Sequence, residues 1–232
     1  MPASFEPPVL VDVDAGVTPP NGTVNRSPSP SSTVQVHTFL PDLVIIDTTQ
    51  ELPVRKELTI LFVDIADSTV TVVNKAPEEA FDQVKNFMHI ITAVAIDYCG
   101  YVKDYEGDGV LLCFKSLTEA TQAALAMRET LVRAQANDPQ ALHARFSLSI
   151  GDVVIGLIGT TLKTSVALIG PCINLAARLL KQIPPGGIIA TATVVERLRR
   201  ETPELARQFT LWNERLELKG FQNEMVTAFH IP

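Results

Sequence analysis

The stretch YVKDYEGDGVLLCF, residues 101–114, predicts a β-hairpin with a negatively charged tip. Its Gly-Asp-Gly turn separates a polar strand from an apolar run that is typical of a buried strand. Three acids, Asp104, Glu106 and Asp108, lie in or beside that turn. This much negative charge next to a buried strand indicates a bound metal ion as one explanation.

The composition is that of one globular domain with a tail, since 46% of the 232 residues are hydrophobic and 19% are charged. The net charge is −7 and no basic cluster stands out, which argues against a nucleic-acid partner. There is no run of about 18 apolar residues and no secretory signal pattern, so we expect no membrane span. Three cysteines in apolar segments, Cys99, Cys113 and Cys172, predict reduced core thiols and a cytoplasmic protein.

The N-terminal part differs in composition from the rest of the chain. Residues 1–50 contain the Pro/Ser-rich stretch TPPNGTVNRSPSPSSTV and few aromatic side chains, so we expect a disordered tail. The more apolar segment 37–49 leaves open a short strand or a docked segment. The folded domain is predicted to cover residues 51–232.

The folded part alternates strands and helices. ELTILFVDI (57–65) is a continuous apolar run that predicts a buried strand. Helices are predicted at 77–100 and 117–135, and within 170–187 from Pro171 to the stop at Pro184-Pro185. Hairpins are predicted at 101–114 and 209–231, one or two strands at 144–159, and a strand followed by a short helix at 187–200. The order strand, helix, hairpin, helix, strand is a split βαβ (ferredoxin-like) pattern. It predicts an α+β fold with an antiparallel or mixed sheet and helices on one face.

Two carboxylates are predicted to meet at one edge of this sheet. Asp64 ends the first strand, Asp108 lies in the hairpin turn, and a split βαβ sheet allows these strands to be neighbours. Two hard oxygen ligands, completed by water and phosphate, suit Mg²⁺ or Mn²⁺ bound with a nucleotide. The alternative is that the Gly-Asp-Gly segment is only a turn.

The turn after Asp64 is a second candidate element. The backbone N–H groups of Ala66, Asp67, Ser68 and Thr69 are candidates for holding a polyphosphate. The alternative is that Asp67 and Ser68 only cap a helix.

The segment INLAAR (173–178) adds a polar pair. Asn174 and Arg178 are four residues apart and share one helix face. A neutral amide and a bidentate cation suit a developing charge on a phosphorus or ribose oxygen. The alternative is a capping Asn and a solvated Arg. Lys219, in LKG, is by itself a residue of a hairpin turn.

Taken together, five motifs resemble the class III nucleotidyl cyclase domain. In chain order they are LFVDIADST, GDGVLLCF, GDVVIGLIG, IGPCINLAARL and LKG. The resemblance covers about residues 56–231. It implies an enzyme that converts a nucleoside triphosphate into a 3′,5′-cyclic monophosphate and pyrophosphate.

The resemblance also implies the roles of the candidate residues. Asp64, Asp108 and the carbonyl of Ile65 would hold two Mn²⁺ or Mg²⁺ ions per active site. It further implies that the sites lie at the interface of a homodimer, with the carboxylates supplied by one chain and the remaining residues by the other.

The residues implied for the second chain are Asn174, Arg178 and Lys219. Asn174 would orient the ribose, and Arg178 would stabilise charge on the α-phosphate in the transition state. Lys219 would neutralise the terminal phosphates.

The base-reading positions depart from those of adenylate and guanylate cyclases. Counting back three residues from Gly107 and from Gly170 gives Asp104 and Ala167, where adenylate cyclases generally carry Lys and Asp or Thr. A carboxylate would face adenine N1 acceptor to acceptor, which is costly. The sequence therefore favours a pyrimidine (UTP or CTP), with adenine and then guanine as alternatives. Small bacterial pyrimidine cyclases of antiphage defence also lack the purine pair, which implies a second messenger for that defence.

Two alternatives remain open. A bulge in the hairpin would bring Lys103 into the base pocket. The count from Gly100 to Gly107 leaves no extra residue, so we expect a regular hairpin with Lys103 exposed on the opposite face. A catalytically inactive module that binds a nucleotide or a partner is the competing hypothesis from another class.

Overall fold

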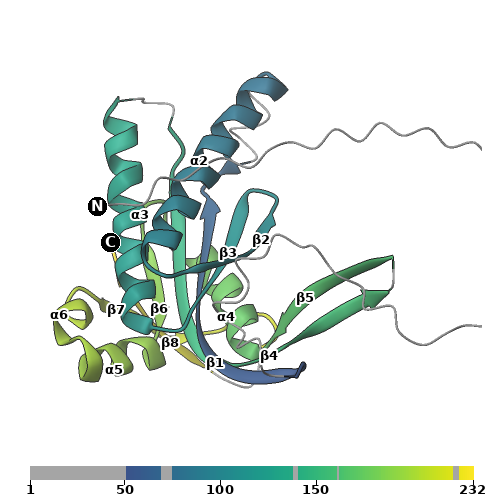
Figure 1. The fold of residues 1–232 in the computed structure, drawn as a ribbon. Helices are drawn as coiled ribbons and strands as arrows, with labels where there is room; N and C mark the ends of the chain where they lie inside the picture. Colours follow the sequence, from purple (N-terminus) through teal and green to yellow (C-terminus); the bar gives the residue numbers. More distant parts are fainter. Residues whose placement is uncertain (1–50, 69–74, 138–140, 161, 222–224) are drawn as a thin grey trace, which may run out of the picture. The chain divides into compact units, whose positions relative to one another are not determined.

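The computed structural model describes residues 51–68, 75–137, 141–160, 162–221 and 225–232. The predicted tail at 1–50, its apolar segment and Thr69 lie outside these residues. Within them, the chain forms a mixed eight-stranded sheet with helices on it (Figure 1). No helix of the described ranges is long and apolar enough to span a bilayer.

The strands are β1 (Val54–Ile65), β2 (Tyr101–Glu106), β3 (Gly109–Phe114), β4 (Ala144–Thr160), β5 (Lys163–Ile169), β6 (Ile188–Thr191), β7 (Thr210–Leu216) and β8 (Val226–Ile231). The helices are α2 (Pro77–Asp97), α3 (Leu117–Asn137), α4 (Pro171–Leu179), α5 (Ala192–Glu201), the short α6 (Pro203–Ala206) and the 3₁₀ helix η2 (Leu180–Gln182). The strand order is β2-β3-β1-β4-β6-β8-β7, and β5 pairs with β4 outside this path.

Strand β1 is the centre of the fold. It pairs antiparallel with β3 on one side and with β4 on the other. Among the strands that the structure describes, only β4 and β6 pair in parallel. The neighbouring positions of β1 and β3 and the mixed sheet confirm the predicted split βαβ arrangement.

Helices cover both faces of the sheet, so the prediction of helices on one face is wrong. Leu61 and Val63 point to the side covered by α2 and α3, which we call the α2/α3 face. Phe62 points to the other side, where Cys172 and Ala176 of α4 pack; we call it the α4 face. A strand buried on both sides reads as a continuous apolar run, and that run does not indicate how the helices divide between the faces.

Three other predictions are refined or corrected. The segment 144–159, predicted as one or two strands, is one 17-residue strand, β4, and the strand β5 that follows it was not predicted. The helix predicted to begin after Pro171 and to stop at Pro184-Pro185 is α4 as far as Leu179 and then the 3₁₀ helix η2 as far as Gln182. Cys113 and Cys172 are buried, as predicted, but Cys99 is exposed. Cys99 follows the end of α2 with a φ of 57°, so its side chain leaves the helix axis and the core.

Candidate functional site

The strand register brings the two predicted carboxylates to the same edge. Asp64 on β1 lies opposite Gly109 on β3, and the Ile65 N–H donates to the Asp108 carbonyl over 3.1 Å. Gly107 has a φ of +66°, which a two-residue hairpin turn requires. A Cβ on Gly109 would lie 3.2 Å from the Val63 carbonyl oxygen, so the missing side chain permits the close approach of β3 to β1.

The turn after Asp64 is held by side chains on both sides. The Ser68 hydroxyl donates to Oδ2 of Asp108. Nη2 of Arg145 on β4 donates to Oδ1 of Asp67 over 3.0 Å. Asp67 itself has a φ of 55°, a left-handed conformation that Asp tolerates better than most residues.

One of the predicted phosphate-binding N–H groups is already engaged. The Ala66 N–H donates to the His143 carbonyl over 2.8 Å and so belongs to the strand pairing. The N–H groups of Asp67 and Ser68 remain as candidates among the described residues.

The carboxylate of Asp64 is partly buried, and its surroundings suit a divalent cation. Burial raises the pKa of Asp64 from its ordinary value of 3.8 to about 6, while the Arg145 guanidinium lowers it and the Asp108 carboxylate raises it. Oδ1 of Asp64 is buried and has no hydrogen-bond partner in the described part of the chain. Such an oxygen carries an uncompensated cost, which a cation would remove.

A divalent ion at this edge would need ligands beyond the protein. Within the described ranges, no three or more His, Cys, Asp or Glu side chains are grouped closely enough to hold a metal. Asp64 and Asp108 are hard oxygen donors, which Mg²⁺ and Mn²⁺ prefer, and Mg²⁺ usually completes its shell with water and phosphate. The two residues therefore fit a nucleotide-dependent metal site.

The raised pKa of Asp64 leads to a pH prediction. Mn²⁺ binds the carboxylate and not the acid, so its affinity should rise steeply between about pH 5 and pH 7 and then level off. Without metal, the free energy of unfolding changes in the opposite direction and falls as the pH rises. The protonated group stabilises the fold fully below 3.8, and this contribution is lost as the pH rises through about 6.

Titration calorimetry with Mn²⁺ and melting curves of the metal-free protein across this pH range would check both parts. In the metal-free Asp64→Asn variant, the loss of stability through about pH 6 should disappear. If the melting temperature of the wild type changes near pH 6 no differently from that of Asp64→Asn, the raised pKa does not belong to Asp64.

A second group of predicted residues lies on α4 and beside it. Asn174 and Arg178 are exposed, on the side of α4 away from the sheet, because Cys172, Ala176 and Leu179 occupy the buried side. Their spacing of one helical turn places the amide and the guanidinium on the same outward surface.

Lys219 is held near the same helix. It is exposed in the turn after β7, between the buried Leu218 and Gly220, whose φ is +91°. Leu218 packs in one cluster with Leu179 of α4, and the partly buried Leu175 packs against that cluster.

The structure thus brings the predicted residues together in two groups and not in one. Asp64 and Asp108 form the carboxylate group, and Asn174, Arg178 and Lys219 form the outward group. No hydrogen bond or ion pair joins the two groups, or occupies the three outward side chains, within the part of the chain that the structure describes.

The hairpin that carries the predicted base-reading position, Asp104, contains a bulge, so the prediction of a regular hairpin is wrong. Val102 lies opposite Leu112 and Asp104 opposite Leu111, which makes Lys103 the extra residue. Its side chain is 14% exposed and lies 3.8 Å from the carboxylate of Asp104, which is 63% exposed. A count between two glycines does not determine which residues pair, so the sequence did not reveal this bulge.

Both residues of the bulge belong to the α4 face, the face of Asp64 and Phe62. Asp104 is opposite Leu111, which packs in the cluster on that face together with Cys113. Burial raises the pKa of the Cys113 thiol to about 12, and the nearby Lys103 ammonium acts against this rise. Lys103 is therefore not an exposed charge on the opposite face, as we predicted. Ala167, the other predicted base-reading position, lies on β5 opposite Gly156 and is half-buried.

Two cations near Asp64 were missed by the sequence reasoning. Arg145 is the direct cross-strand neighbour of Asp64 on β4. Lys181 in η2 is close enough for its charge to lower the pKa of Asp64, against the larger effect of burial. The register of β4 would have revealed Arg145, but nothing in the sequence indicates that η2 lies over β1.

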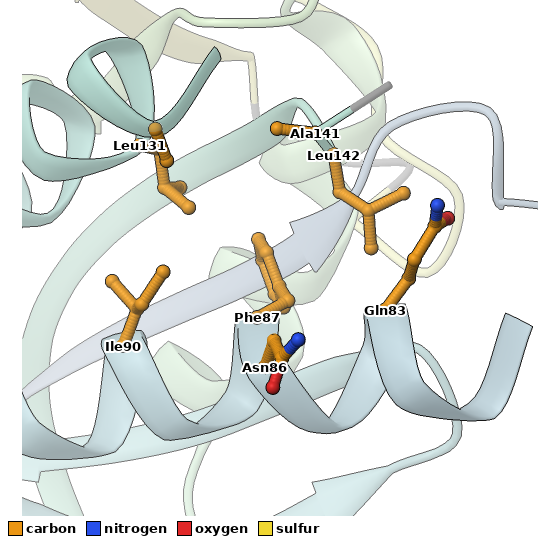
Figure 2. Close-up of a pocket in the computed structure, with 8 residues that line it drawn as sticks. Gln83, Asn86, Phe87, Ile90, Leu131, Ala141 and Leu142 are labelled. Atoms are coloured by element: carbon orange, nitrogen blue, oxygen red, sulfur yellow. The ribbon is translucent and has the colours of Figure 1, made fainter. Parts of the chain in front are cut away.

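An apolar cavity of about 190 Å³ lies elsewhere, between α2, α3 and the start of β4. Figure 2 shows Phe87 and Ile90 of α2 with Leu131 of α3 and Leu142 around it. These side chains pack on the α2/α3 face, and no predicted site residue lines the cavity. It is therefore separate from the carboxylate group.

Known structures share this fold. The crystal structure of the adenylyl cyclase CyaB from P. aeruginosa has a TM-score of 0.67 at 23% identity, covering 77% of this chain and 95% of that one. The guanylate cyclase domain of RhGC from Catenaria anguillulae, crystallised with GTP, has a TM-score of 0.66 at 18% identity, covering 77% and 98%. These similarities confirm the predicted α+β class III cyclase fold.

Curated relatives are longer than this chain. Adenylate cyclase 1 of Rhizobium meliloti is 25% identical over 136 residues, which are 54% of this chain and 20% of the relative. An uncharacterized protein of Mycobacterium tuberculosis is 26% identical over 152 residues, 63% of this chain and 28% of that protein. This chain thus spans less than a third of the length of either. Residues 51–231 match the family model of the adenylate and guanylate cyclase catalytic domain. On that match, the chain belongs to the adenylate and guanylate cyclase catalytic domain family.

Proposed function

We propose that the chain is an active nucleotidyl cyclase, which forms a 3′,5′-cyclic nucleoside monophosphate and pyrophosphate from a nucleoside triphosphate. The observation that carries the proposal is Oδ1 of Asp64, which lies beside Asp108, is buried and has no hydrogen-bond partner in the described ranges of the chain. An inactive module would not need to keep an uncompensated carboxylate oxygen at this edge.

Asp64, Asp108 and the Ile65 carbonyl are the proposed holders of two Mg²⁺ or Mn²⁺ ions. When bound, such ions lower the pKa of the ribose 3′-hydroxyl and offset the charge of the phosphates. Ser68 keeps the Asp108 carboxylate in place, because its hydroxyl donates to Oδ2. The N–H groups of Asp67 and Ser68 are the proposed contacts to the phosphates.

The outward group is proposed to bind the ribose and the phosphates of the substrate. We assign Asn174 to the ribose, Arg178 to the charge that develops on the α-phosphate, and Lys219 to the terminal phosphates. All three are exposed and unpartnered in the described part of the chain, so a substrate would not have to displace an internal partner.

We propose that a homodimer assembles the site, with the carboxylates from one chain and the outward residues from the other. The outward position of Asn174 and Arg178, on the side of α4 away from the sheet, supports this arrangement. So does the arm formed by β5 and the end of β4, which extends past β1 (Figure 1). The arm exposes the apolar side chains Leu157, Ile158, Leu162 and Ile169. Exposed apolar side chains gathered on one arm are typical of an interface.

For the base, we propose ATP as the first candidate. A pyrimidine was favoured because Asp104 alone cannot donate a hydrogen bond to adenine N1. Lys103, whose ammonium lies 3.8 Å from the Asp104 carboxylate, can donate that bond. An ammonium beside a carboxylate matches the adjacent acceptor and donor of adenine, N1 and the 6-amino group.

A pyrimidine triphosphate is the second candidate, because Ala167 offers no polar partner and leaves space beside the hairpin. The Lys103–Asp104 pair also matches N3 and the 4-amino group of cytosine. The proposed role in antiphage defence depends on a cyclic pyrimidine product. If the product is a cyclic purine nucleotide, the proposed role is general cyclic-nucleotide signalling.

Turnover of the purified chain with Mn²⁺ and each of ATP, GTP, CTP and UTP tests the proposal. We expect one dominant cyclic product, identified by its mass. Nucleotide binding without any cyclic product would favour the inactive module.

The bulge gives a prediction for base selection. Lys103→Ala should lower kcat/KM for the preferred nucleotide by about tenfold to a hundredfold, because a buried base edge loses its charged donor. Asp104→Ala should cost less, because Asp104 is the more exposed of the two. Glu106→Ala, a change at an exposed residue of the same strand, is the matched control. If Asp104→Ala costs more than Lys103→Ala, Asp104 and not Lys103 reads the base.

A further inference from the structure

Lys181 is held on the α4 face of the sheet, the face of Asp64, by the packing of its own chain. Its neighbour Leu180 is buried in the same cluster as Phe62 of β1, on the α4 face. Phe62 precedes Asp64 by two residues, so both side chains point to this face. Lys181 is exposed next to this packing, and its charge lowers the pKa of Asp64 against the larger effect of burial.

The two cations beside Asp64 differ in what they bind. Arg145 is engaged, because its guanidinium holds the carboxylate of Asp67 at 3.0 Å. Lys181 makes no hydrogen bond or ion pair in the described part of the chain. Its ammonium therefore has all three donors available at the edge where the metal and the triphosphate would bind.

We propose that Lys181 is a phosphate-binding residue that acts within the same chain as Asp64 and Asp108. This inference rests on the proposed cyclase function and concerns the triphosphate end of that site. A lysine cannot ligate a divalent cation while charged, and next to two metal-binding carboxylates it disfavours the bare ion. It becomes favourable once a polyanion arrives, since an ammonium is a good point-charge partner for phosphate.

This role predicts effects of opposite sign on two ligands. Removing the Lys181 charge should leave Mn²⁺ binding unchanged or tighten it, because one repulsive charge is gone. It should weaken the binding of Mn²⁺ with a triphosphate, because one charge-assisted contact is lost. A residue that only supports the fold would weaken both.

The test is titration calorimetry of the full chain with Mn²⁺ alone and with Mn²⁺ plus inorganic tripolyphosphate. Lys181→Ala should raise the dissociation constant for Mn²⁺–tripolyphosphate by about tenfold. Lys181→Arg should restore most of the affinity, because the charge is kept. Lys115→Ala, which removes an exposed lysine after β3, should change neither titration.

The contrary results are distinct. A Lys181→Ala protein with unchanged tripolyphosphate affinity overturns the role of Lys181 and leaves the cyclase proposal standing. Equal weakening of Mn²⁺ and tripolyphosphate binding assigns Lys181 a structural role instead. Wild-type protein that binds Mn²⁺ but neither tripolyphosphate nor a nucleoside triphosphate overturns the proposed function itself.

Discussion

Asp64→Asn is expected to lower Mn²⁺-dependent cyclase turnover by at least about a thousandfold. The amide has the shape of the carboxylate but lacks its charge, so the fold is kept while a divalent ion loses its principal anionic ligand. Oδ1 of Asp64 is buried and has no hydrogen-bond partner among the residues that the structure describes, and Asp67, the acid of the adjacent turn, is held by Arg145.

The measurement is kcat with the preferred nucleotide, together with Mn²⁺ binding by calorimetry. Asp97→Asn, the same chemical change at an exposed residue at the end of α2, is the control and should have no effect. Because desolvation penalises the charged Asp64, the metal-free Asp64→Asn protein should be at least as stable as the wild type at pH 7. Turnover above about a tenth of the wild-type value would remove Asp64 from the metal site.

Two inactive variants should restore each other when they are mixed. Asp64→Asn damages the carboxylate group and Arg178→Ala damages the outward group, which we place on opposite sides of each composite site. A mixed dimer then contains one site with both groups intact. After subunit exchange at equal amounts, about half of the dimers are mixed, so activity should return to about a quarter of the wild-type value.

The control for this experiment mixes Asp64→Asn with Asp108→Asn. Both changes fall in the same group, so every pairing leaves each site damaged and no activity should return. If the mixture of Asp64→Asn and Arg178→Ala also stays inactive although exchange is demonstrated, the residues act within one chain and the composite site is wrong.

The features of the fold that local sequence encodes could be predicted. The apolar run of β1, the Gly-Asp-Gly turn and the helical spacing of Asn174 and Arg178 each depend on neighbouring residues. They led to the pairing of β1 with β3, the meeting of Asp64 with the hairpin tip, and the shared helix face.

The features that depend on contacts between distant segments could not be predicted. The bulge at Lys103 arises from how β2 pairs with β3, and the charge of Lys181 reaches Asp64 only because η2 packs on β1. Strand β5 was missed because much of its surface is exposed and its sequence, KTSVALI, is not a clear apolar run. In each case, the deciding interaction joins residues far apart in the chain.

Gly109 limits which residues the chain can accept beside Asp64. Where β3 passes β1 beside Asp64, the main chains are so close that a Cβ would meet the Val63 carbonyl oxygen at 3.2 Å. A side chain at position 109 would therefore force β3 to move by a few tenths of an ångström away from β1. That movement would change the distance between Asp64 and Asp108, the two carboxylates that we propose as metal ligands.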